Sequence, residues 1–406
     1  MAWFPRPRWP TAATRACMGD SAPGAEGAVL KGRLPRWWRW GWPLLLLVLA
    51  AAVPLLVWLG WSAISGSSDG TVVGDPIDPA APGYEAFVEP TPTLLLVHAN
   101  GDRLHGVTLL VLTDEGTEGA VLFIPPETMT SNGLLSDHWV KSGSTGVADS
   151  VAELLGVRPG ETQVVDDAGW AALVSAVAPV DLMSAVPLLG PDGETRYGAG
   201  LVTLAAADVG SYLAGRSPGE SPLDALGRHL SFWTGWLVQV EESTAPDVIP
   251  GETDRGMGRF GRSLAEGKRL LSTVVGQVDD SGSVVLNPEF VRRQMNEIVP
   301  FPILAADGSL PKVRLLNGVG DLELTKAAAR ELSRAGAHIT RIGNAAEFGW
   351  ETTRVAYHDT GFAPHAEAFR DALGTGTVIA EELPDISVDI TVTFGADFSQ
   401  LMTGDG

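Results

Sequence analysis

The chain of 406 residues has a single cysteine, Cys17, so it cannot form a disulfide bond within itself. It is also poor in positive charge, with 28 Lys and Arg residues against 49 Asp and Glu residues. Seven of the basic residues lie in residues 1–41 beside only two acids, so residues 42–406 carry a net charge near −26. A body this acidic is not expected to bind nucleic acid, because phosphate groups attract cations.

Sequence motifs of several common chemistries are missing as well. The chain has no Gly-x-Ser-x-Gly nucleophile motif and no Walker phosphate-binding loop. Asn-Gly-Val-Gly at 317–320 follows a predicted strand but lacks the lysine of such a loop, and a tight turn before a helix explains it. The seven histidines show no metal-ligand spacing. Two of them, His98 and His105, flank one predicted turn, which we interpret as a coincidence of a hairpin.

One long apolar segment is present, WPLLLLVLAAAVPLLVWLGW at residues 42–61. Twenty residues without a charge can span a hydrocarbon core of about 30 Å, and tryptophans stand at both ends. A cleaved signal peptide and a buried globular helix are the alternatives, but the run begins late and is long and uncharged. Because the basic segment 1–41 precedes it, we predict a single-pass plasma-membrane protein with a cytoplasmic N-terminus and an extracytoplasmic body.

The exported part is predicted to contain a flexible tether at 62–92, an α/β domain at 93–304 and a small domain at 311–400. Three apolar strands with tight turns indicate a sheet meander. Helical spacing follows the strands. The smaller domain shows the order βαββαβ, which predicts a split βαβ sandwich, so the fold class is α/β throughout. The predicted strands are 93–99, 106–114 and 119–125, and the predicted helices are 147–155, 166–178, 203–214, 223–240, 261–275 and 288–298.

The smaller domain resembles the C-terminal domain of the LytR family. The likeness rests on VRLLNGVGDLELTKAAARELSRAGAHITRIGNA, then TTRVAYHD, then DITVTFGADF. These segments contain a strand that ends in Leu-Asn-Gly, an alanine-rich helix that ends in Ala335-Gly336, and a terminal Gly-Ala-Asp-Phe at 395–398. In that family the domain follows a membrane anchor and a LytR-CpsA-Psr catalytic domain, which matches the layout inferred above.

The domain at 93–304 resembles that catalytic domain in the order of its elements. The resemblance implies an enzyme that attaches glycopolymers to peptidoglycan by phosphotransfer from a polyprenyl-pyrophosphate carrier. Arginines would grip the pyrophosphate and aspartates would hold Mg²⁺. Val107-Thr108 stands where the family has Asp-Thr, and Pro126 stands where it has the arginine of Pro-Arg-Asp-Thr. Two arginines of a later motif remain, Arg216 and Arg228.

Four residues are therefore candidate remnants of a reaction centre. Glu127 and Thr128 would belong to the metal site, and Arg216 and Arg228 to the phosphate site. Each has a simpler interpretation, because an acid and a threonine after two prolines commonly form a turn or a helix cap. Helical arginines are often solvated or paired with local acids. The local acids are Glu220 and Asp224. Trp233 and Trp236 are expected to be core residues, or to cover an apolar groove for a polyprenyl chain.

Three functions remain open from the sequence. Losing one charge-stabilising group typically lowers the catalytic rate about 10²–10³-fold. Several such losses favour an accessory protein, for which no cofactor is expected. Such a protein would bind peptidoglycan, a polyprenyl-linked glycan or envelope proteins. A divergent phosphotransferase that uses Arg216, Arg228 and Glu127 with Mg²⁺ is the alternative, and a structural spacer is the third. Convergence of these three residues in one apolar-walled cleft would favour the enzyme or a lipid-binding protein.

Overall fold

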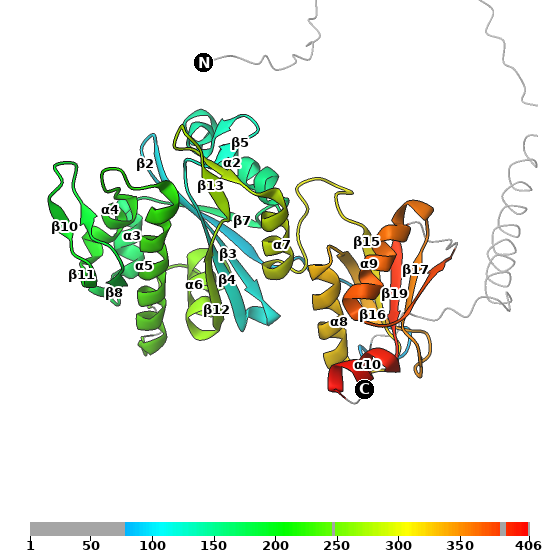
Figure 1. Ribbon diagram of the computed structural model, residues 1–406. Coiled ribbons are helices and arrows are strands. Elements are labelled where there is room, and N and C mark those ends of the chain that lie inside the picture. The colour runs from blue at the N-terminus through cyan, green and yellow to red at the C-terminus, as the bar shows by residue number, and fades with distance from the viewer. Residues whose placement is uncertain (1–77, 246–247, 382–386, 405–406) are drawn as a thin grey trace, which may run out of the picture. The chain divides into compact units, whose positions relative to one another are not determined.

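The computed structural model describes residues 78–245, 248–381 and 387–404 (Figure 1). The predicted basic segment 1–41 and the predicted membrane helix 42–61 lie outside these ranges. Among the described residues, no helix is both long and apolar enough to cross a bilayer. The α/β fold class is confirmed, and two large sheets with separate hydrophobic cores define two domains.

The first domain is built on a five-stranded sheet, in the order β12 (Lys268–Thr273), β4 (Glu118–Ile124), β3 (Arg103–Thr113), β2 (Thr93–Asn100) and β7 (Glu161–Val165). The predicted meander is β2-β3-β4, in which β3 is antiparallel to both neighbours. The outer strands β7 and β12 run parallel to β2 and β4. The meander prediction is therefore confirmed, and the outer strands extend it on both sides.

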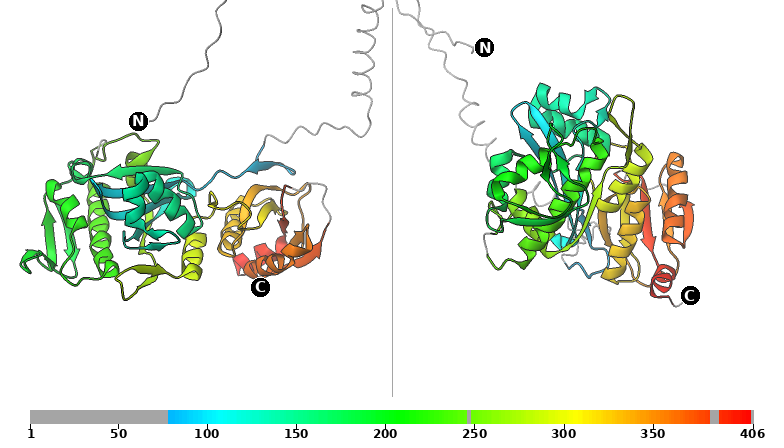
Figure 2. Two further views of the ribbon diagram at one scale, coloured as in Figure 1. Left: turned by 90° about the horizontal axis from the view of Figure 1, so that it is seen from above. Right: turned by 60° about the vertical axis from the view of Figure 1, so that its left-hand side comes forward.

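Helices cover both faces of this sheet (Figures 1 and 2). Along β2, Leu94 and Leu96 face one core, while Leu95 and Val97 face the other. Burial on both faces explains why the strands read as continuous apolar runs. One core includes α3 (Asp167–Val174), α4 (Val209–Ala214), α5 (Pro222–Glu242) and α6 (Gly256–Glu266). The other includes α2 (Leu135–Leu155) and α7 (Pro288–Ile298).

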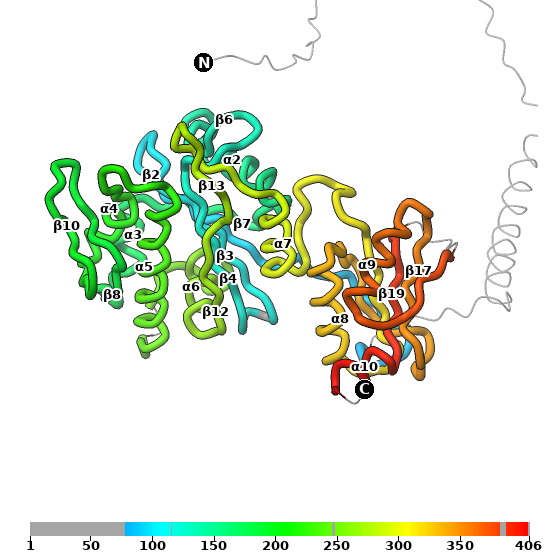
Figure 3. Tube along the Cα trace, viewed as in Figure 1, coloured from blue at the N-terminus to red at the C-terminus, as the bar shows by residue number. Residues whose placement is uncertain are grey.

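Several short strands surround this framework. An antiparallel pair, β8 (Val180–Ser184) and β11 (Gly200–Leu204), lies beside α5 (Figures 1 and 3). The other short strands are β5 (Met129–Thr130), β6 (Gly133–Leu134), β9 (Leu188–Leu189), β10 (Thr195–Tyr197), β13 (Gly276–Val278) and β14 (Val284–Leu286). Three 3₁₀ turns also occur among the described residues, at Asp114–Gly116, Ala206–Asp208 and Thr360–Phe362.

The helix predictions differ in accuracy. The predicted helix at 288–298 is α7 as observed, and the predicted helix at 223–240 lies within α5. The helix predicted at 261–275 is wrong beyond Glu266, because Gly267 packs closely against the Thr117 backbone and the chain continues as β12. The helix predicted at 203–214 begins too early, because residues 200–204 pair with β8 as β11.

The second domain contains a six-stranded sheet, in the order β1 (Glu85–Phe87), β16 (His338–Asn344), β15 (Lys312–Asn317), β19 (Ile390–Phe394), β17 (Arg354–Tyr357) and β18 (Thr377–Ala380). The helices are α8 (Leu322–Arg334), α9 (Ala363–Leu373) and α10 (Ala396–Thr403). The predicted βαββαβ order is present, with β18 inserted before the closing strand. The predicted split is wrong: α8 joins β15 to β16, and α9 joins β17 to β18, and each pair is parallel and directly adjacent.

The terminal Gly-Ala-Asp-Phe motif closes the second domain through Asp397. Its carboxylate accepts hydrogen bonds from the Thr353 amide and hydroxyl, and from the Thr375 hydroxyl at 2.8 Å. Burial alone would raise the pKa of Asp397, but these hydrogen bonds to the charged form outweigh it and lower the pKa. Gly395 lies against the Thr352 backbone, where a Cβ would be only 2.8 Å from the carbonyl carbon.

Part of the predicted tether 62–92 belongs to the second domain. Residues 85–87 form β1, which pairs antiparallel with β16. The Glu85 carboxylate binds the guanidinium of Arg314 on β15, the strand on the far side of β16. The Asn344 side chain donates to the carbonyls of Pro79 and Ala81, at 2.9 and 2.8 Å. The residues just before the first domain therefore supply an edge strand to the second.

Candidate functional site

Three of the four candidate residues come together at one edge of the first sheet. Strand β4 ends at this edge and β3 begins there, because Ile124 pairs with Val107. Glu127 follows β4 after two prolines, Arg216 lies in the loop between α4 and α5, and Arg228 lies in the second turn of α5. The chain thus brings together residues that are about a hundred positions apart in the sequence.

Arg216 and Glu127 form a half-buried ion pair. Nη2 of Arg216 donates to both carboxylate oxygens of Glu127, at 2.9 and 3.1 Å. Nη1 of Arg216 donates to the Ser221 carbonyl at 3.1 Å. The two side chains are 30% and 35% exposed. The acid that stands in the position of the family's motif aspartate therefore serves as the counter-charge of an arginine.

Arg228 and Glu220 form a second ion pair, which is buried. Their side chains are 1% and 9% exposed, and both terminal nitrogens of Arg228 donate to the Glu220 carboxylate. The Ser217 amide donates to the same carboxylate at 2.9 Å. Burial alone would raise the pKa of Glu220, but the bonds from Arg228 and Ser217 outweigh it, so the pKa is lowered. Glu220 is therefore a carboxylate at neutral pH.

The loop at 215–221 connects the two ion pairs. Its Gly215 carbonyl accepts a hydrogen bond from Arg228, and its Ser221 carbonyl accepts one from Arg216. The positive charge of Arg216 also helps to lower the pKa of Glu220, so the two pairs lie within electrostatic reach. Both guanidinium groups are thus neutralised by carboxylates of the chain itself.

Thr128 does not point toward this cluster. Its side chain is fully buried, and its hydroxyl donates to the Pro125 carbonyl at 2.7 Å. The Thr128 amide donates to the same carbonyl at 3.1 Å, which closes a turn after β4. These two hydrogen bonds agree with the simpler interpretation of the sequence, in which Thr128 forms a turn, rather than with a metal-ligand role.

The residues at this edge do not fit a Mg²⁺ ion. Glu127, the candidate ligand, is engaged by Arg216, and the position of the second motif acid carries the apolar side chain of Val107. Over the described part of the chain, no three His, Cys, Asp or Glu side chains are placed to hold a metal ion. At these two positions the chain therefore offers one carboxylate, which is already paired with a guanidinium.

A cavity of about 380 Å³ adjoins the buried ion pair. Arg228, Glu220 and Asp224 provide its charged wall, and apolar residues around β9 provide the opposite wall. The remaining lining residues are Ser184, Ala185, Val186, Pro187, Leu189, Ser217 and Gly227. Arg216 and Glu127 do not line this cavity, so the convergence that the sequence left open is partial.

A histidine cluster, which sequence reasoning did not recognise as a cluster, lies at the same sheet edge. His98 Nε2 is 3.3 Å from an Asp167 carboxylate oxygen, and the rings of His98 and His105 are 5.1 Å apart. Burial and the neighbouring His105 lower the pKa of His98 to about 4. Burial, with the neighbouring His98 and Arg228, lowers the pKa of His229 to about 3. These buried rings are therefore neutral at physiological pH.

Little in the sequence could have revealed this cluster. His98 and His105 flank one turn, but Asp167 and His229 lie far away along the chain. Gly106 allows the approach of His229, since a Cβ at position 106 would be 3.2 Å from its ring. Such contacts depend on how α3 and α5 lie against the sheet.

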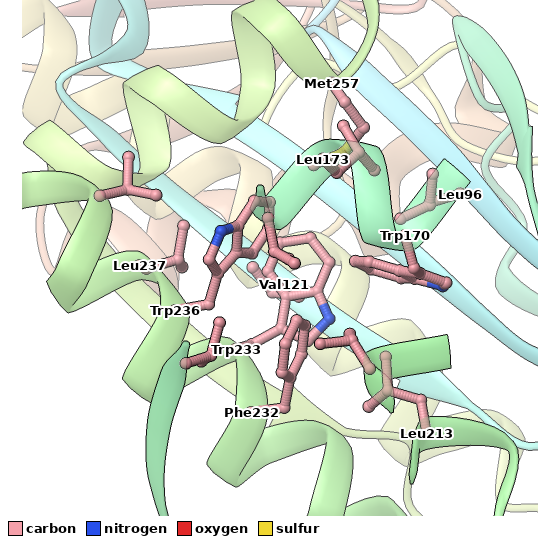
Figure 4. Packing of buried hydrophobic residues seen from close by; sticks show 14 of the residues in the cluster. Leu96, Val121, Trp170, Leu173, Leu213, Phe232, Trp233, Trp236, Leu237 and Met257 are labelled. Atoms are coloured by element: carbon pink, nitrogen blue, oxygen red, sulfur yellow. The ribbon is translucent and has the colours of Figure 1, made fainter. Parts of the chain in front are cut away.

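An aromatic cluster fills the space between α5 and the sheet (Figure 4). Trp170, Phe232, Trp233 and Trp236 are all at most 2% exposed. Ring centroids of neighbouring pairs are 5.2 to 6.2 Å apart, and most pairs meet edge to face. Trp233 and Trp236 are therefore core residues, as the first of the two sequence interpretations had it.

Comparison with known proteins identifies the second domain. Residues 311–398 match the family model described as LytR cell envelope-related transcriptional attenuator. No curated protein sequence matches the chain.

Solved structures are similar to the chain at low sequence identity. B. subtilis TagT is 14% identical, with 57% of this chain and 96% of TagT covered and a TM-score of 0.42. B. subtilis TagV is 12% identical, with coverages of 52% and 97% and a TM-score of 0.41. The LytR-CPS2A-psr family protein YwtF (TagT) with bound octaprenyl pyrophosphate lipid is 15% identical, with coverages of 57% and 96% and a TM-score of 0.41. The family match supports the assignment of residues 311–398 as a LytR C-terminal domain.

Proposed function

We propose that the protein is an accessory protein of the cell envelope, tethered to the plasma membrane by residues 42–61. Its first domain binds envelope components or partner proteins and transfers no phosphoryl group. The C-terminal match to a cell-envelope family supports the compartment. The observation that supports the absence of transfer is the pairing of both remaining arginines with carboxylates of the chain.

The buried pair argues most strongly against phosphate binding. A phosphate would need the N–H donors of Arg228, which are directed to Glu220 and the Gly215 carbonyl in a site that is 1% exposed. Displacing Glu220 would leave a buried carboxylate without a partner, which costs about 3–5 kcal/mol. Arg216 is more accessible, but its charge is balanced by Glu127.

The aromatic cluster supports the same proposal. A polyprenyl chain needs an open apolar channel, and the space between α5 and the sheet is occupied by Trp170, Trp233 and Trp236. A chain entering there would have to displace rings that are buried and in contact with one another.

A phosphotransferase remains the second candidate, because Arg216, Arg228 and Glu127 do meet at one sheet edge near a cavity. The test is to incubate the full-length protein in nanodiscs with a polyprenyl-pyrophosphate-linked glycan, peptidoglycan and Mg²⁺, and to measure glycan transfer. We expect no transfer above the protein-free control. If glycan transfer is observed, and if each of the single variants Arg216→Ala and Arg228→Lys abolishes it, the protein is a phosphotransferase.

The single cysteine permits a test of the tether. In intact cells, a membrane-impermeant maleimide is expected to leave Cys17 unlabelled and to label a Leu401→Cys variant, because Leu401 is 51% exposed. Labelling of Cys17 without permeabilisation would contradict the orientation. This outcome would not bear on the arginine pairs, so the location and the lack of transfer are tested separately.

A further inference from the structure

A second concave surface lies on the first domain, between α5 and the β8–β11 pair. Residues of this pair alternate, so that Leu182 and Val202 enter the core. Met183 and Leu201 point outward, pair directly across the strands, and are 67% and 70% exposed. Two large apolar side chains are thus exposed next to each other. Single exposed apolar residues are common on protein surfaces, but adjacent ones can mark an interaction site.

One face of α5 forms the other wall of this surface. The lining positions are spaced by four residues along the helix, as one helical face requires. They are Leu230, Ser231, Thr234, Gly235, Val238, Gln239 and Glu242. With Asp181, Leu182, Met183 and Leu201 these residues enclose about 510 Å³, which we call the α5–β8 groove.

The walls of the α5–β8 groove are held in place by polar contacts and by Gly235. A Cβ at position 235 would lie 2.3 Å from the Asp181 carbonyl oxygen, so only glycine allows this approach. The Gln239 side chain accepts from the Asp181 amide and donates to the Pro179 carbonyl, both at 3.1 Å. The groove is therefore a built feature of the fold rather than a gap between mobile loops.

The groove is acidic at one end and apolar at the other. The contacts of Asp181 with Gly235 and Gln239, together with Ser184 near Arg228, show that β8 runs opposite to α5. Asp181 and Glu242 therefore lie toward one end, while Met183 and Leu201 lie toward the other. Both charged residues among those that line the groove are acids.

We propose that the α5–β8 groove binds an extended polypeptide segment of a partner protein, with a basic residue at one end and apolar residues after it. The span from Leu230 to Glu242 is about 18 Å at 1.5 Å per residue, which fits about five or six extended residues. Asp181 and Glu242 repel an anionic lipid surface and attract Lys or Arg. A second copy of this chain is disfavoured by a net charge of −21 on each.

This inference goes beyond the proposed function, because it concerns a different surface and holds whether or not the protein transfers phosphoryl groups. The apolar end supplies binding free energy by burying Met183 and Leu201, and the acidic end sets the direction of the bound segment.

The test uses the full-length protein in nanodiscs and two fluorescein-labelled hexapeptides. One peptide carries lysine at its amino end followed by alternating leucine and threonine, and the other has glutamate in place of the lysine. In anisotropy titrations we expect the lysine peptide to bind at least about tenfold more tightly, and the preference to weaken with salt. A reversed version of each peptide determines the direction of binding.

Variants locate the binding site. Met183→Thr combined with Leu201→Thr is expected to weaken binding about tenfold or more while keeping β-branched strand residues. Val238→Lys tests the helix wall without altering strand pairing, in case the first variant unfolds, and is expected to weaken binding because its positive charge repels the lysine of the peptide. The double variant Asp181→Asn, Glu242→Gln is expected to remove the preference for lysine. Leu270→Thr is the control, because Leu270 is 53% exposed on β12 and does not line the groove.

Several results would overturn the proposal. These are equal binding of the lysine and glutamate peptides, binding that survives both the strand and the helix variants, and no binding at millimolar peptide. If the strand variant instead abolishes binding to anionic vesicles, the groove serves a lipid surface. If it instead dissociates a dimer in sedimentation, the groove serves a second copy, and in either case the polypeptide proposal is wrong.

Discussion

Removing the guanidinium of Arg228 is expected to destabilise the first domain strongly. Arg228→Met keeps much of the side-chain volume but leaves the Glu220 carboxylate, which is 9% exposed, with the Ser217 amide as its remaining strong partner. It also removes the donor to the Gly215 carbonyl. Breaking one side of a buried ion pair costs roughly 3–5 kcal/mol, whereas replacing both sides with apolar groups is often neutral.

The assay is urea denaturation of the full-length protein, monitored by near-UV circular dichroism, a signal to which the buried tryptophan cluster contributes. With a slope of about 2–3 kcal/mol per molar urea, a loss of about 3 kcal/mol lowers the midpoint by roughly 1–1.5 M. The double variant Arg228→Met, Glu220→Leu is expected to recover most of this loss. The control is Arg158→Met, because the Arg158–Asp149 pair is 50% and 61% exposed and its loss should be barely measurable.

The reasoning is refuted if Arg228→Met shifts the midpoint no more than Arg158→Met does. It is also refuted if the double variant is less stable than Arg228→Met alone, because the cost would then not come from an unpaired carboxylate.

Two further predictions concern titratable groups. The folded pKa of His98, about 4, lies below its ordinary value of 6.5, so its contribution to stability is complete above pH 6.5 and is lost as the pH falls toward 4. We expect His98→Gln to reduce the acid-induced loss in that window by up to about 3 kcal/mol, and equal slopes of stability against pH in both proteins would contradict this. The pKa of Asp397 is lowered in the folded state, so its contribution is present above the unfolded pKa and is lost as the pH falls through the folded value. Asp397→Asn, which turns a donor toward the Thr353 and Thr375 donors, should cost the second domain about 1.5–3 kcal/mol, measured by hydrogen exchange in residues 351–398; unchanged exchange would contradict the anchoring role.

Much of the framework could be predicted because local patterns determine it. Apolar runs mark β2, β3 and β4, and Gly156 ends α2 in the left-handed conformation with φ of 72°. The order of its motifs identifies the smaller domain. Strand β12 could not be predicted after α6, because its pairing with β4 joins residues about 150 positions apart. Its sequence, KRLLST, also lacks a regular alternation of apolar and polar residues.

The candidate site was harder to predict, for a related reason. The Arg228–Glu220 pair spans eight residues and was among the local alternatives considered. The Arg216–Glu127 pair spans 89 residues, and the His98–Asp167 contact spans 69, so both depend on tertiary packing. A sequence can show that an arginine has lost its neighbours in a motif, but it cannot show which acid has become its partner.

The edge strand β1 affects how the two domains can be separated from each other. A protease that nicks the connection at 305–310 would leave the two fragments associated, because the amino-terminal fragment still contributes residues 85–87 to the other fragment's sheet. Conversely, a recombinant fragment that begins at residue 311 would leave β16 as an exposed edge strand. Its unpaired backbone groups could then pair with strands of other molecules. The LytR-type domain of this chain therefore includes residues at least as far back as Pro79, more than two hundred positions before the matched segment.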